Sequence, residues 1–178
     1  MTDYDVVLLA EQPLTAVDAA NLRGLHGEIE DPVVYHLLLP AEDASARVEG
    51  ALGSISTGEV ISTPPVALDP EDVQRLREEL LATCRTEVEA SVAEISAAGG
   101  RAVGEPVTTE PIEALAAKVA EVDAREVIIM TRPHVVAEFF HLDWTSKARR
   151  KLGVPVLHLL EHENFDEQAG EGEGISGF

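Results

Sequence analysis

The residues best suited to chemistry gather between positions 132 and 151. Five of the 13 basic residues lie there, in a chain whose net charge is −20: Arg132, Lys147, Arg149, Arg150 and Lys151. Thr145 and Ser146 add hydroxyl donors to this stretch. Cations and hydroxyl groups together bind phosphates and carboxylates. The stretch is therefore a candidate site for an anionic ligand.

A structural role competes with this interpretation. Residues 147–151 come just before Gly153, and basic side chains in the last turns of a helix stabilise the negative end of its dipole. For Arg149, Arg150 and Lys151 we favour that structural role. Arg132 and His134 stand in a loop that has no such need, so both roles stay open for them.

Other reactive residues form no recognisable site. His134, His141 and Asp143 are near one another in sequence, but no third histidine completes a metal motif such as H-E-x-x-H. The one cysteine, Cys84, lies on an apolar helical stripe, which predicts a buried structural thiol. No G-x-S-x-G elbow occurs. We therefore expect no catalytic residues and no metal.

The composition narrows the classes of partner. The chain has 178 residues, 33 acidic against 13 basic, and 45% hydrophobic residues, which predicts one globular domain. Such an acidic chain is a poor partner for nucleic acid or an anionic membrane surface. No run approaches the roughly 20 apolar residues of a membrane span, and the N-terminus is acidic, unlike a secretory signal. We expect a cytoplasmic protein.

The first forty residues are predicted to form a strand, a helix and a second strand. Val6–Ala10 and Val33–Leu39 are apolar runs that suit strands buried on both faces. Between them, Thr15 and Asp18 resemble a capping box at the start of a helix over 16–26. Two strands joined by one helix form a parallel pair. Residues 41–68 are less regular, with a possible short helix over Glu42–Leu52 and a loop after it.

The rest of the chain continues the alternation. A long helix begins at Asp69-Pro70 and ends at Gly99-Gly100, with apolar residues three or four apart: Val73, Leu76, Leu80, Cys84, Val88, Val92 and Ile95. The later elements are a strand over Arg101–Thr108, a helix near 112–122, a strand over Val127–Met130, a helix over 136–152 and a strand over Val154–Leu160. This order predicts an α/β fold with a mostly parallel five-stranded sheet and helices on both faces.

Two local patterns carry a family resemblance. The stretch Ala124–Arg132 and the closing strand Gly153–Leu159, together with the element order from Asp5 to Leu160, resemble the universal stress protein family. The resemblance implies a three-layer, Rossmann-like α/β/α fold with strand order 3-2-1-4-5. It also implies a single domain over residues 1–160, after which residues 161–178 form an acidic tail that we expect to be mobile or to follow the surface.

Nucleotide-binding members of that family carry G-x2-G-x9-G-[ST] after the fourth strand. By spacing, this motif falls on Thr131, His134, Trp144 and Thr145, so all three glycines are replaced. Glycines let the backbone approach phosphates closely. The chain therefore resembles the divergent, glycine-poor members. We expect no cofactor and weak or absent ATP binding, with an adenine nucleotide as the alternative.

The implied strand order also places a ligand site. The connections lead in opposite directions from the first and fourth strands, and ligands of open α/β sheets bind at the carboxyl ends of the strands at that point. The family's acidic residue after the first strand falls at about Glu11, which could bind a sugar hydroxyl or pair with Arg132. The predicted ligand-binding residues are Glu11, Thr131, Arg132, His134, Thr145 and Ser146.

The resemblance implies a non-enzymatic regulatory or stress-associated role. It also implies a homodimer paired through Val154–Leu160, where an apolar edge strand invites association. Two alternatives stay open. One is a nucleotide- or anion-binding switch or enzyme of the same α/β class, and the other is an interaction module that works through its aromatic helix and acidic tail.

Overall fold

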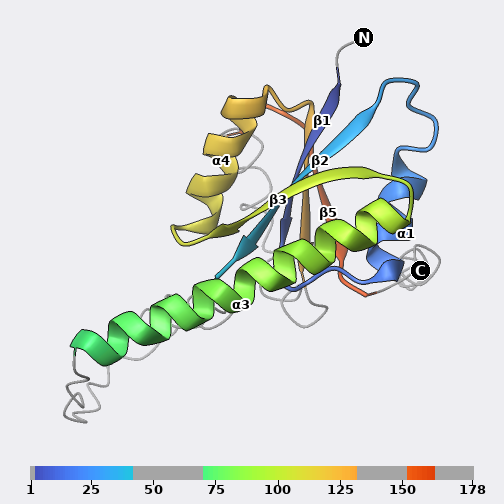
Figure 1. The fold of residues 1–178 in the computed structure, drawn as a ribbon. Coiled ribbons are helices and arrows are strands. Elements are labelled where there is room, and N and C mark those ends of the chain that lie inside the picture. Colours follow the sequence, from blue (N-terminus) through green and yellow to red (C-terminus); the bar gives the residue numbers. More distant parts are fainter. Residues whose placement is uncertain (1–2, 42–69, 132–151, 163–178) are drawn as a thin grey trace, which may run out of the picture.

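The computed structural model describes residues 3–41, 70–131 and 152–162. They form one parallel sheet of five strands in the order β3-β2-β1-β4-β5 (Figure 1). The predicted sheet and its strand order are therefore confirmed. The strands are β1 (Tyr4–Ala10), β2 (Val33–Pro40), β3 (Arg101–Val107), β4 (Glu126–Thr131) and β5 (Val156–Leu160).

Three described helices cover the two faces of this sheet. The helices are α1 (Ala16–Leu25), α3 (Pro70–Ala97) and α4 (Pro111–Val122). Helices α1 and α3 pack on one face, and α4 packs on the other (Figure 1). This arrangement gives the predicted three layers. No helix among the described residues is long and apolar enough to cross a bilayer.

The alternation of side chains in β1 explains why its sequence is apolar throughout. Val6, Leu8 and Ala10 belong to the core under α1 and α3, whereas Val7 and Leu9 belong to the core under α4. A central strand of a parallel sheet is buried on both faces, so it has no polar side. The two cores meet through β1 and fix its position in the middle of the sheet.

Helix α3 differs from the sequence prediction in one respect. Its apolar stripe is buried at Cys84, Val88 and Ile95, but Leu80 is exposed, because the first part of α3 extends past the sheet (Figure 1). The predicted buried thiol is confirmed, since Cys84 donates a 3.4 Å hydrogen bond to the Leu39 carbonyl and burial raises its pKa. The helix ends as predicted, with Gly99 at a φ of +81°.

The last strand is shorter than predicted, because it begins at Val156 instead of Val154. Pro155 has no amide hydrogen for the ladder, although its carbonyl accepts the Val127 amide at 2.9 Å. The helix predicted over 136–152, apart from Leu152, lies outside the described residues. So does the stretch 41–68, apart from Ala41, with its predicted helix over Glu42–Leu52 and the loop after it.

Candidate ligand site at the carboxyl ends of β1 and β4

The sheet order puts two predicted site residues side by side. Glu11 follows β1 directly, Thr131 ends β4, and the Glu11 amide donates to the Met130 carbonyl at 3.1 Å. From this place the connection after β1 leads to β2 on one side of the sheet, and the connection after β4 leads to β5 on the other. We call it the β1–β4 end. The other predicted residues, Arg132, His134, Thr145 and Ser146, lie outside the described part of the chain.

The Thr131 side chain is held on the face of the sheet that α4 covers. Its hydroxyl oxygen lies 2.8 Å from Nε2 of His158 in β5. Burial lowers the pKa of His158, so its imidazole is neutral at neutral pH. Thr131 is therefore positioned by a neutral hydrogen bond between the last two strands of the sheet.

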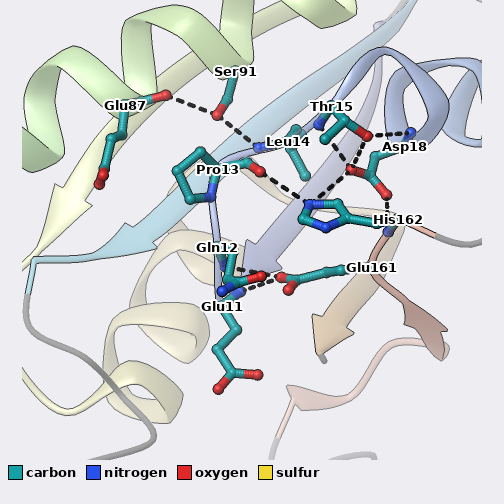
Figure 2. A network of polar contacts seen from close by, with 10 residues as sticks. All are labelled: Glu11, Gln12, Pro13, Leu14, Thr15, Asp18, Glu87, Ser91, Glu161 and His162. Atoms are coloured by element: carbon teal, nitrogen blue, oxygen red, sulfur yellow. Dashed lines mark hydrogen bonds and ion pairs between the residues drawn. The ribbon is translucent and has the colours of Figure 1, made fainter. Parts of the chain in front are cut away.

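The carboxyl group of Glu161 lies at the β1–β4 end. The Glu161 amide donates to the Thr131 carbonyl at 2.9 Å, which extends β5 beside β4. Its side chain then reaches β1, where Oε1 accepts the amides of Glu11 at 2.8 Å and Gln12 at 2.9 Å (Figure 2). Glu161 is only 2% exposed. The protein's own carboxyl group thus holds the two amides that follow β1.

The two oxygens of Glu161 have different surroundings. Oε1 accepts both amides, whereas Oε2 is buried and has no hydrogen-bond partner among the described residues. Burial raises the pKa of Glu161 to about 7, although the amides of Gln12 and Glu11 act to lower it. The negative charges of Glu11 and Asp18 raise this pKa further. The carboxyl group is therefore partly protonated at neutral pH.

A second carboxyl group, that of Asp18, ties the next residue to the same loop. Asp18 is fully buried, and its Oδ2 accepts the Thr15 amide at 2.8 Å and the Thr15 hydroxyl at 2.7 Å, which confirms the predicted capping box. Its Oδ1 accepts the His162 amide at 2.7 Å (Figure 2). Residues 161 and 162 are thus fixed to both ends of the connection between β1 and α1.

Helix α3 holds this connection from another side. The hydroxyl of Ser91 accepts the Leu14 amide at 3.0 Å and donates to the Glu87 carbonyl at 2.8 Å (Figure 2). Ser91 is fully buried. Because its hydroxyl serves both backbone groups, the loop cannot shift without leaving a buried polar group unpaired. The connection after β1 is therefore fixed to α3 at Leu14.

Sequence reasoning missed Glu161, His162 and Ser91. Glu161 and His162 were assigned to the acidic tail, but Glu161 is buried, so the expected surface path does not hold for it. In the structure, Glu161 follows the buried Leu159 by two positions and is itself buried. The remaining tail residues, 163–178, lie outside the described residues.

The two described histidines away from the β1–β4 end, His26 and His36, have structural partners. Nε2 of His36 lies 2.7 Å from Oδ1 of Asp5. His26, at the opposite end of the sheet, contacts the Tyr35 hydroxyl at 2.8 Å through Nδ1 and the Glu126 carboxylate through Nε2. Within the described ranges, no group of three or more His, Cys, Asp or Glu residues could hold a metal.

A shallow hollow lies away from the β1–β4 end, over β2, β3 and α4. Its polar lining consists of His36, Glu105 and Lys118. The Lys118 ammonium is already paired, at 3.0 Å from Glu105 and 2.8 Å from Glu121. Since its cation is neutralised by two carboxylates, the hollow offers an anion little, and we assign no ligand to it.

Comparisons with known proteins concern the fold. No protein-family model matches the chain, and no curated protein matches it significantly. Among solved structures, the hypothetical protein MJ0577, the subject of a structure-based assignment of biochemical function, aligns with this chain with a TM-score of 0.50. The alignment covers 90% of this chain and 99% of that one at 12% identity.

Two further solved structures are of universal stress protein family proteins. One is from Arabidopsis thaliana and has AMP bound. Its alignment covers 92% of this chain and 94% of that one at 13% identity, with a TM-score of 0.49. One from Burkholderia pseudomallei covers 88% and 96% at 18% identity, with a TM-score of 0.47. The five parallel strands in the order 3-2-1-4-5, with helices on both faces, form the universal-stress-like fold that the family resemblance implies, and the alignment with MJ0577 supports this α/β fold.

Proposed function

We propose that this protein is a non-enzymatic, stress-associated regulatory protein that binds a small anionic ligand at the β1–β4 end. One observation carries the proposal: the amides of Glu11 and Gln12 converge on a single carboxyl oxygen. Converging backbone amides are a general means of holding an oxyanion. Amides that hold the oxygen of Glu161 can hold an oxygen of a ligand carboxylate or phosphate in its place.

The charge of the described surroundings requires a cation for this role. Glu11 and Asp18 are both acidic, and their negative charges would repel an anionic ligand. Arg132, which follows Thr131 directly in the sequence, would supply a permanent, forked positive charge. In the proposal, Arg132 carries the affinity for the anion, while His134, Thr145 and Ser146 add donors.

An adenine nucleotide bound in the manner of the glycine-rich family members is not the ligand we propose. His134 and Trp144 replace glycines that would face the phosphates, and each brings a Cβ atom and a ring. We therefore propose that ATP binds weakly or not at all. Isothermal titration that gives an ATP dissociation constant in the low micromolar range or tighter would refute this part.

A thermal-shift screen tests the ligand class. Small carboxylates and phosphates, with neutral and cationic compounds as references, are added to the wild type, Arg132→Ala and Arg101→Ala. Arg101 is the matched control, because it is an exposed arginine that pairs with Asp3 at 3.2 Å. Anionic compounds should stabilise the wild type and Arg101→Ala, but not Arg132→Ala. Hits that are neutral or cationic, or anionic hits that Arg132→Ala leaves unchanged, would refute the proposal.

We further propose that the protein is cytoplasmic and forms a homodimer through β5. β5 is an edge strand of the described sheet, and Leu157 on it is 39% exposed. An edge strand with an exposed apolar residue favours pairing with a second copy around a two-fold axis.

A further inference from the structure

We propose that Glu161 is an acid-closed latch on the β1–β4 end: its neutral carboxyl group shields the amides of Glu11 and Gln12, and its ionisation loosens that contact. The inference concerns the regulation of the ligand site and rests on the proposed function. Nothing in the family resemblance points to it, because it arises from one side chain at the end of β5.

The geometry favours a neutral carboxyl group in the closed position. Only Oε1 is used by the two amides, while Oε2 has no partner among the described residues, and the whole residue is 2% exposed. Burying an ionised carboxylate with an unsatisfied oxygen costs far more free energy than burying a neutral one. Closing the latch therefore favours the uptake of a proton.

Two carboxylates near Glu161 act in the same direction. The connection after β1 contributes Glu11, and α1 contributes Asp18; both carboxylates disfavour a third negative charge. The neighbouring His162 places Nε2 at 3.6 Å from Asp18 Oδ2, while His158 in β5 is bound to Thr131 on the other face. Helix α3 contributes the neutral hydroxyl of Ser91 to this loop.

The latch can open without detaching the backbone. The His162 amide remains bound to Asp18, and the Glu161 amide remains bound to the Thr131 carbonyl, when only the Glu161 side chain swings away. The side chain then leaves the two amides facing the β1–β4 end. Because the closed carboxyl group has a pKa of about 7 and an exposed one titrates near 4.5, opening becomes easier as the pH rises between these values. Above pH 7 the equilibrium between the closed and open latch no longer changes much with pH.

Amide hydrogen exchange, followed by NMR between pH 5 and 8 without ligand, tests the latch. The Gln12 amide is the clean reporter, since the Glu11 amide also donates to Met130. After correction for intrinsic exchange, the protection of Gln12 in the wild type should fall about 50-fold from pH 5 to pH 7.5 and then level off. The Leu14 amide, held in the same loop by Ser91, is the internal control and should not follow this profile.

The same exchange measurement on the variant Glu161→Gln is the second part of the test. Its side-chain oxygen can accept both amides, but it carries no titratable proton, so the pH dependence at Gln12 should disappear. A wild-type protection factor that does not change with pH, or an equal fall in Glu161→Gln, would overturn the latch. The wild-type profile is decisive alone if the variant does not fold. Because no ligand is present, this result is independent of the thermal-shift screen, which tests the ligand site.

Discussion

The carboxyl oxygen of Glu161 and the backbone amide of Gln12 are 149 positions apart in the chain and 2.9 Å apart in the structure. This hydrogen bond crosses the end of β4 and joins the last strand to the middle strand of the sheet (Figure 2). The place where ligands enter open α/β sheets is therefore occupied, in this chain, by a side chain of the protein itself.

Glu161 should make the free energy of unfolding depend on pH. Its pKa is about 7 in the folded protein and about 4.5 in the unfolded chain, so the folded state binds the proton more tightly. The resulting stabilisation is complete below pH 4.5 and is lost as the pH rises to 7, by up to about 3 kcal/mol. Urea unfolding of the wild type and Glu161→Gln at pH 5.0 and 7.5 measures this. A stability difference between the two proteins that is the same at both pH values contradicts it.

Ser91→Ala should destabilise the protein by about 1–3 kcal/mol, because the Leu14 amide loses its acceptor in a buried position. Ser96→Ala is the matched control in the same helix. Its hydroxyl donates to the Val92 carbonyl at 2.8 Å on the exposed face, so its removal should change stability by less than about 0.5 kcal/mol. Denaturant unfolding that finds equal effects for the two variants would argue against a structural role of Ser91 in the loop.

Gly104→Ala tests the close packing of α3 on β3. A Cβ atom there would lie 2.6 Å from Cγ1 of Val88 and 3.0 Å from Cγ2 of Val92, so the valine side chains or the helix that carries them must shift. The expected loss is about 1–3 kcal/mol. Gly24→Ala in α1 meets no heavy atom within 4 Å and should raise stability by up to about 1 kcal/mol through helix propensity. Thermal unfolding distinguishes the two, and a neutral Gly104→Ala would show that the contact can relax.

The homodimer is tested by substitutions at the two edges of the sheet. Leu157 on β5 is 39% exposed, and Val103 on β3, at the opposite edge, is 55% exposed. Light scattering should give the wild type and Val103→Glu a mass near twice the 19.1 kDa of one chain, and Leu157→Glu the mass of one chain. A buried like-charge pair at a two-fold interface causes the dissociation. A monomeric wild type at micromolar concentration rules out the dimer.

The fold was predictable because its signals are local and repeated. The apolar run Val6–Ala10 indicates a buried strand by itself, without knowledge of the neighbouring strands. The pair Thr15 and Asp18 indicates the start of α1, where the structure shows a capping box. Leu80 was misjudged, since periodicity shows which face of a helix is apolar but not where the sheet beneath it ends.

The candidate site was predictable only in part. Topology placed Glu11 and Thr131 together, and the structure confirms that placement, while the roles of Arg132, His134, Thr145 and Ser146 stay predictions. Glu161 was missed because an acidic stretch of sequence indicates residues that are exposed to solvent. Its burial depends on amides that come about 150 positions earlier in the chain. The spacing of the residues in the sequence does not reveal such a contact.

The titration of Glu161 itself tests the account most directly. The carboxyl carbon of Glu161 is assigned by NMR, using the signal that is absent from Glu161→Gln, and its chemical shift is followed from pH 3 to 9. A buried carboxyl group at the β1–β4 end should titrate with a midpoint of about 7. A midpoint near 4.5, the ordinary value, would show that closing this end of the sheet does not favour the neutral carboxyl group, and it would contradict the latch.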